Sequence, residues 1–407
     1  MTETEPSAQR NAKASFCVPK AAIKALIDAK ADVVMIGAYL TLACYTEATG
    51  QFSSASVTAM SKVMSLNKDR ARKAMERLAA IQVKVGKHQH SALVYSRDAW
   101  IKAKGAPLPD GPVERAKILH VLPDFGEELG DRVWFSRNLV EGIGSFRQPL
   151  KRIKDAGDAA GRLFLLMQQA VDVAGWLAIP PNAGPWVHYE TVLDQNVGSA
   201  RVIHGKHAGP VMWTQWIEAY GFDAVEALIG SGLFYEVVMV LNRNPKPRKF
   251  SSGEEYGGVP PDAEPLYELD TRSIHGYKPQ GEEGLAGLTA KTVGEIGHSV
   301  AAGQIETESG EHWHADGLAP GAFMGKYAAI VPAGYGTMIV GVYRPRFRVT
   351  NPKNAGVKDA WLRIYENQRI GLALIEQLRV AMGLKPLTAT EKPPVKDEPE
   401  PPSKALH

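Results

Sequence analysis

Apolar residues recur at helical spacing in three consecutive segments near the start of the chain. The spacing predicts a helix over Asp32–Thr46, a short helix over Ser56–Met64 and a third helix over Lys68–Ile81. Asn67 stands where the third helix would begin, and asparagine is a favoured N-cap residue. Val83–Tyr95 then alternates around a polar turn, which predicts two strands. The expected order is three helices followed by a hairpin.

The same spacing predicts which side chains face the core. We expect the first helix to be amphipathic and the turn before the third helix to bury a leucine. The residues predicted to point inward are Val33, Ile36, Leu40, Ala43, Cys44, Val57, Met60, Val63, Leu66, Ala71, Met75, Leu78 and Ala79.

A second set of elements with a similar order follows. Helical spacing predicts helices over residues 158–173, with Asp158 as the candidate cap, and over residues 211–220 and 223–229. A strand over residues 233–241 comes next, and residues 265–270 are its candidate partner across a long loop. This order of helices followed by a hairpin resembles a winged helix, although its third helix carries Asp223 and Glu226 and no basic residue.

Composition shifts divide the chain into six parts and favour an α+β fold. Pro107, Pro109 and Pro112 mark a linker, and the last residues are rich in proline and mixed charge, which opposes a packed core. A last helix is predicted over residues 358–382. The expected divisions are a disordered start over 1–13, a first domain over 14–104, a linker over 105–117, a second winged-helix-like domain over 118–270, a mixed α/β region over 271–384 and a disordered tail over 385–407.

Overall composition is that of a globular protein. The 407 residues carry a net charge of only +3, and the two cysteines, Cys17 and Cys44, are too few for a disulfide framework or a four-thiolate zinc site. No apolar signal core or bilayer-length apolar run occurs. These features predict a soluble protein of the reducing cytoplasm that is associated with the nucleoid and has no membrane partner.

The N-terminal order of elements resembles the winged helix-turn-helix domains of bacterial, plasmid and phage DNA-binding proteins. The resemblance covers residues 15–100, about a quarter of the chain. In that family the third helix enters the major groove and the hairpin, or wing, touches the backbone or minor groove. The resemblance therefore implies a reading helix that carries Asn67, Lys68, Arg70, Arg72, Lys73 and Arg77, and a wing that carries Lys84, Lys87, His88 and His90.

Charge supports this resemblance independently. The segment Ser61–His90 holds eight basic and two acidic residues. Proteins draw much of their affinity for DNA from such phosphate contacts. The alternative is a solvated helix face, or a winged helix that contacts only other proteins.

Three further segments have unbalanced charge. Arg344, Arg346 and Arg348 occupy every second position, so they would share one face of a strand. This row of arginines is either a second nucleic-acid contact or a solvated strand edge. Residues 147–154 are basic and would touch phosphate or simply begin a helix. Residues 251–320 hold thirteen acidic and three basic residues, and this segment should not face DNA.

No sequence pattern points to catalysis or to a cofactor. The chain lacks a phosphate-binding P-loop, a dinucleotide-binding glycine pattern and a nucleophile elbow. His312, His314 and Asp316 are too few to define a metal site without a distant partner. We therefore expect no enzyme activity, no cofactor, no metal and no catalytic residues.

Together these observations predict a sequence-specific protein for double-stranded DNA that regulates transcription as a homodimer. Two alternatives stay open. If both winged-helix-like units are real, the architecture resembles plasmid and phage replication initiators. If the charged helix contacts no DNA, the chain is an assembly or adaptor protein.

Overall fold

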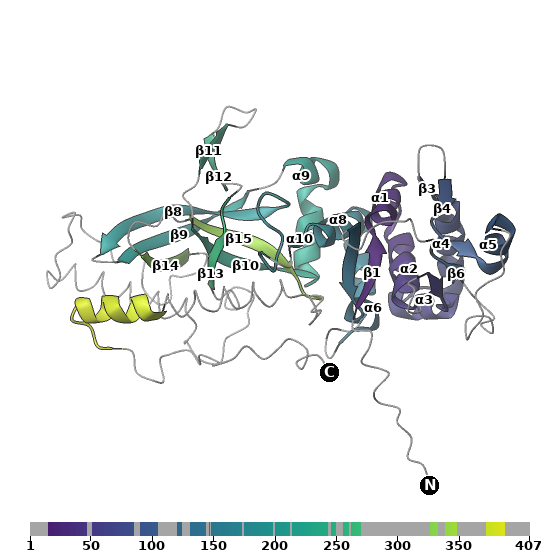
Figure 1. Ribbon diagram of the computed structural model, residues 1–407, viewed down its shortest axis with the longest axis horizontal. Helices are drawn as coiled ribbons and strands as arrows, with labels where there is room; N and C mark the ends of the chain where they lie inside the picture. Colours follow the sequence, from purple (N-terminus) through teal and green to yellow (C-terminus); the bar gives the residue numbers. More distant parts are fainter. Residues whose placement is uncertain are drawn as a thin grey trace, which may run out of the picture. The chain divides into compact units, whose positions relative to one another are not determined.

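The computed structural model describes residues 15–46, 51–84, 90–104, 120–123, 131–143, 146, 148–172, 175–197, 200–211, 214–242, 246–249, 255–259, 262–269, 326–332, 338–347 and 372–386. The chain divides into two compact units that interleave along the sequence (Figure 1). Unit 1 comprises Met1–Ala170, Gln215–Tyr235 and Pro345–Asn351, and unit 2 comprises Val171–Thr214, Glu236–Arg344 and Pro352–His407. Both units contain helices and strands, so the predicted α+β class is confirmed.

The predicted order of three helices and a hairpin is present in unit 1. The helices are α2 (Val33–Cys44), α3 (Val57–Met64) and α4 (Lys68–Ala80). The antiparallel strands β3 (Gln82–Lys84) and β4 (His90–Ala92) follow α4. The side chain of Asn67 accepts a hydrogen bond from the backbone N–H of Arg70, which confirms the predicted N-cap of α4.

The central helix of unit 1 is α2, and it is buried on every side. All twelve of its residues are buried, so the predicted amphipathic character is wrong. Its polar Thr41 donates to the carbonyl of Gly37 at 2.7 Å. Its N-terminus is closed by two carboxylates: Asp32 accepts from Met35 N–H at 2.8 Å, and Asp158 accepts from Val33 N–H at 2.9 Å. Asp158 therefore caps α2, not its own helix as predicted.

Most of the predicted inward positions of α3 and α4 are confirmed. Met60, Ala71, Met75 and Leu78 are buried. Ala79 is exposed and Ala74 takes its place in the core, because the buried stripe follows positions 71, 74, 75 and 78. Three other predicted core residues are only half-buried: Val57, Val63 and Leu66.

Several elements of unit 1 have no counterpart in the sequence analysis. Strand β1 (Ser15–Pro19) pairs with β7 (Arg132–Ser136), and the inner face of this pair buries phenylalanines such as Phe16 and Phe135. Helix α1 (Lys20–Asp28) packs against α8 and β3. Three short strands form a small sheet in the order β2-β6-β5: β2 (Phe52–Ser53), β5 (Tyr95–Ser96) and β6 (His120–Val121). Helix α5 (Arg97–Lys104) follows β5.

Helices from later in the chain complete unit 1. Helices α7 and α8 pack against α2, and α10 packs against both α7 and α8. These elements have the bounds α6 (Asn138–Glu141), α7 (Pro149–Ala156), α8 (Asp158–Gln169), α9 (Thr214–Tyr220) and α10 (Phe222–Gly230).

Unit 2 is built on a six-stranded sheet with the order β13-β10-β15-β8-β9-β14. Its two long strands, β8 and β9, pair along their length (Figure 1). The strands have the bounds β8 (Trp186–Val197), β9 (Ala200–Val211), β10 (Phe234–Leu241), β13 (Pro265–Leu269), β14 (Lys326–Pro332) and β15 (Met338–Pro345). A separate pair, β11 (Lys246–Lys249) and β12 (Glu255–Gly258), lies between β10 and β13 in the sequence.

The predicted pairing of the strand over residues 233–241 with residues 265–270 is confirmed as β10 with β13. The two strands belong to the large sheet, and β10 also pairs with β15. Helices α8 and α10 belong to unit 1, whereas β13 and most of β10 belong to unit 2. The helices and strands of the predicted second winged-helix-like domain thus lie in different units, and they do not form an isolated wing.

Some sequence predictions fall outside the described residues. These are the disordered start over 1–13, the linker over 105–117 and nearly all of the tail over 385–407. Of the helix predicted over residues 358–382, the structure describes residues 372–381 as helix. Most of the acidic segment over 251–320 also lies outside the described residues.

Candidate nucleic-acid interface

The basic side chains predicted on the third helix all lie on the exposed part of α4. Its buried stripe packs against α2 and α3, which turns the opposite surface outward. The five exposed basic residues are Lys68, Arg70, Arg72, Lys73 and Arg77.

These cations differ in whether a carboxylate neutralises them. Arg72 forms an ion pair with Asp69 at 2.9 Å, and Arg77 forms one with Asp32, the N-cap residue of α2. Within the part of the chain that the structure describes, Lys68, Arg70 and Lys73 make no side-chain hydrogen bond or ion pair. These three cations are therefore available to an anionic partner.

The charges on α4 are arranged in stripes. Arg70, Lys73 and Arg77 follow one another at spacings of three and four residues, so they share one side of the helix. Asp69 and Glu76 are seven residues apart and run along the middle of the exposed surface. An anion is therefore attracted more strongly to the Arg70 side of α4 than to its centre.

The hairpin after α4 adds a further cation. Lys84 at the end of β3 pairs in register with His90 at the start of β4, and both side chains are exposed. The next pair in register, Val83 and Ser91, is buried and fixes the hairpin to unit 1. Lys87 and His88 of the predicted wing lie outside the described residues.

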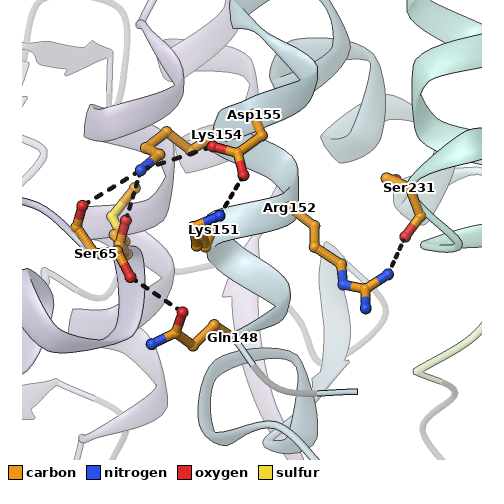
Figure 2. Close-up of polar contacts among 8 residues, drawn as sticks. Ser65, Gln148, Lys151, Arg152, Lys154, Asp155 and Ser231 are labelled. Carbon is orange, nitrogen blue, oxygen red and sulfur yellow. Dashed lines mark hydrogen bonds and ion pairs between the residues drawn. The ribbon is translucent and has the colours of Figure 1, made fainter. Parts of the chain in front are cut away.

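The turn between α3 and α4 is held by Lys154 of α7 and by Gln148, the residue before α7 (Figure 2). Lys154 donates to the carbonyls of Met64 at 3.0 Å and Ser65 at 3.4 Å. Gln148 accepts a hydrogen bond from the Ser65 hydroxyl at 3.0 Å. These contacts join residues more than eighty positions apart, and no local pattern in the sequence indicates them.

The other basic residues of α7 are also occupied. Lys151 donates to Asp155 at 2.8 Å, and this hydrogen bond is the main cause of a lowered pKa of the Asp155 carboxyl. Arg152 donates to the carbonyl of Ser231 at 2.9 Å, as Figure 2 shows, and its guanidinium stacks 3.7 Å from the centre of the Phe146 ring. The basic segment over residues 147–154 thus serves packing inside unit 1, as far as it is described.

Arg344 corrects the predicted second nucleic-acid contact. Its side chain is 4% exposed. Its Nη1 atom donates to both carboxylate oxygens of Glu268, at 2.9 and 3.1 Å, and its Nε atom donates to the carbonyl of Leu177. A guanidinium that is buried and paired in this way is not accessible to phosphate, so Arg344 is a structural residue of unit 2.

Arg346 is exposed but has partners of its own in unit 1. It donates to the carbonyl of Gly232 at 2.6 Å and lies over the rings of Phe146 and Tyr235. Gly232 has a φ of +73°, which favours glycine. Arg348, the third arginine of the predicted row, lies outside the described residues.

The described residues give no geometry for a metal or for a membrane span. In this part of the chain, no group of three or more His, Cys, Asp or Glu side chains is placed to hold a metal ion. His312, His314 and Asp316 lie outside it. None of the described helices combines the length and apolar character that crossing a bilayer requires.

Comparison with protein families, with curated proteins and with solved structures finds no significant match to this chain. The candidate interface therefore depends on its own geometry: an exposed helix with three unpaired cations, preceded by a braced turn and followed by a short hairpin.

Proposed function

We propose that this protein binds double-stranded DNA in a sequence-specific manner and regulates transcription as a homodimer. In this proposal α4 enters the major groove, and the β3–β4 hairpin contacts the flanking backbone through Lys84. Arg70, Lys73 and Lys68 contact phosphate or base edges. A major groove about 12 Å wide admits one α-helix with its side chains.

One observation carries the proposal: three cations of α4 have no partner in the described structure, whereas the basic residues of α7 do. A cation that stabilises the fold is usually hydrogen-bonded or paired, as Lys154 and Arg152 are. Unpaired guanidinium and ammonium groups grouped on one exposed helix fit the phosphate oxygens of a duplex. The order of helices, turn and hairpin is also that of the family which the sequence resembles.

Binding selection from randomised duplex DNA tests the proposal. The full-length protein is incubated with the library at about physiological salt, and bound fragments are sequenced over several rounds. We expect recovery of a defined motif, and a regulator that binds as a dimer should recover it as an inverted repeat. Absence of enrichment with protein shown to be folded by circular dichroism would refute DNA reading.

The symmetry of the recovered motif distinguishes the two DNA functions. Inverted half-sites support a dimeric regulator. Direct repeats would instead favour a replication initiator. If no duplex shows salt-sensitive binding, the exposed surface of α4 would instead be a contact for another protein.

A further inference from the structure

Two residues with the same unusual backbone meet beside the proposed reading helix. Ser65 ends α3 with a φ of 51°, and Gln148 precedes α7 with a φ of 52°. Residues other than glycine adopt this left-handed conformation at a cost, and they keep it where surrounding contacts hold it. Here the Ser65 hydroxyl donates to the Gln148 side chain at 3.0 Å, so the two strained residues hold each other (Figure 2).

Lys154 provides the second contact that holds this turn. The last carbonyls of a helix have no partner within the helix, and a cation there is favourable. The Lys154 ammonium donates to two of these carbonyls, those of Met64 and Ser65, and its side chain is only 18% exposed. A solvent-facing lysine that bound phosphate would not be withdrawn from water in this way.

Helix α7 is itself firmly placed. Leu150 and Ile153 are buried between its neighbours. On the side away from the turn, Arg152 bonds the carbonyl of Ser231 at the end of α10 and stacks on Phe146. One helix therefore links the end of α3 to the end of α10.

We infer that α7 positions the DNA-reading helix, with Lys154 and Gln148 as positioning residues that do not touch the DNA. This inference rests on the proposed function. Only Leu66 and Asn67 separate Ser65 from the first residue of α4, so the backbone at Ser65 sets the direction in which α4 leaves the turn. Without these contacts, the turn would allow α4 to leave in other directions. Affinity for the specific site would then fall more than nonspecific affinity, because base contacts need accurately placed side chains and phosphate contacts do not.

The test compares Lys154→Met with Lys151→Met in the full-length chain. Both changes remove one ammonium from α7 and keep the length of the side chain, but Lys151 bonds only Asp155. In Lys154→Met we expect amide exchange over residues 65–68 to become about ten- to hundredfold faster, because a hydrogen bond from a charged group is lost. We expect wild-type exchange at the same amides in Lys151→Met.

DNA binding gives the second readout. Lys154→Met should bind the selected site less tightly while affinity for unrelated duplex and the dependence of binding on salt stay unchanged. A salt slope reduced by about 0.9 would show that Lys154 itself neutralises a phosphate, and this would overturn the inference. Unchanged specificity together with unchanged exchange would overturn it as well.

Two further variants keep the test decisive. If Lys154→Met does not fold, Gln148→Ala removes only the bond to Ser65 and should also speed exchange at the turn; no change there overturns the inference. Lys154→Arg retains a cationic donor and should restore slow exchange and specificity. A wild-type protein that binds no duplex would refute the proposed function, and exchange at residues 65–68 would still decide whether α7 holds the turn.

Discussion

The double substitution Arg70→Ala, Lys73→Ala addresses the candidate interface most directly. Both side chains are exposed, share one side of α4 and make no hydrogen bond or ion pair within the described structure. The buried stripe of α4 is untouched, and alanine is a good helix former. We therefore expect the free energy of unfolding to change by less than about 0.5 kcal/mol.

The effect on binding follows from the two lost cations. Each phosphate that a protein neutralises contributes about 0.9 to the slope of log affinity against log salt. Two lost contacts should lower that slope by about 1.8 for each bound protomer. Between about 50 and 200 mM salt, the wild type should thus lose more affinity than the variant does, by about twelvefold for one bound protomer and about 150-fold for a bound dimer. If Arg70 also contacts a base, the substitution should in addition remove about 1–3 kcal/mol of discrimination at one position of the site.

Fluorescence anisotropy with labelled duplex, measured over a salt series, supplies both the affinity and the slope. The matched control is Lys20→Ala, Lys24→Ala, which removes the same charge from α1, where the two lysines pair with Asp131 and Asp28. The control should keep the wild-type slope. A folded Arg70→Ala, Lys73→Ala protein with unchanged affinity and slope would refute the placement of DNA on α4.

Three further predictions concern the fold. Gly341→Ala should destabilise unit 2 by about 1–3 kcal/mol in urea unfolding, because the new methyl would lie 2.2 Å from the Glu236 carboxylate and 2.8 Å from Val187 Cβ; stability within error of the wild type would contradict this. Burial lowers the pKa of His120, so the folded state resists its protonation and stability should fall as pH drops below about 6.5. His120→Asn should flatten that part of the pH profile, and an unaltered profile would exclude His120 as its cause. Burial raises the pKa of Cys44 to about 12, so a thiol reagent at neutral pH should label Cys44 only after unfolding, and rapid labelling of the native protein would argue against its burial.

Local rules in the sequence predicted much of unit 1. Asn67 follows a turn and precedes a periodic segment, and it caps α4 as expected. The three helices and the hairpin have the predicted order because each is encoded within a few consecutive residues. The complete burial of α2 also had a local signal, since Val34, Met35 and Leu42 fill the face that an amphipathic helix would leave polar.

The features that the sequence could not predict depend on distant partners. Asp158 stands where a cap of its own helix is expected, but its carboxylate accepts from Val33, which is 125 positions away. The alternation around Arg344 places it correctly on a strand, yet its burial depends on Glu268 from another strand of the sheet. Spacing along the chain says which side chains share a face, and it does not say what covers that face.

This distinction sharpens the candidate interface. Three basic segments could not be distinguished by residue type alone, because a cation that binds phosphate and a cation that binds a carbonyl can be the same kind of side chain. The structure separates them by their partners: Lys154 and Arg152 end on backbone carbonyls and Arg344 on a carboxylate, whereas Arg70 and Lys73 end in solvent. Removing a cation of the first kind should cost stability, and removing one of the second kind should cost binding alone. The comparison of Lys154→Met with Arg70→Ala, Lys73→Ala therefore tests one physical claim from both sides.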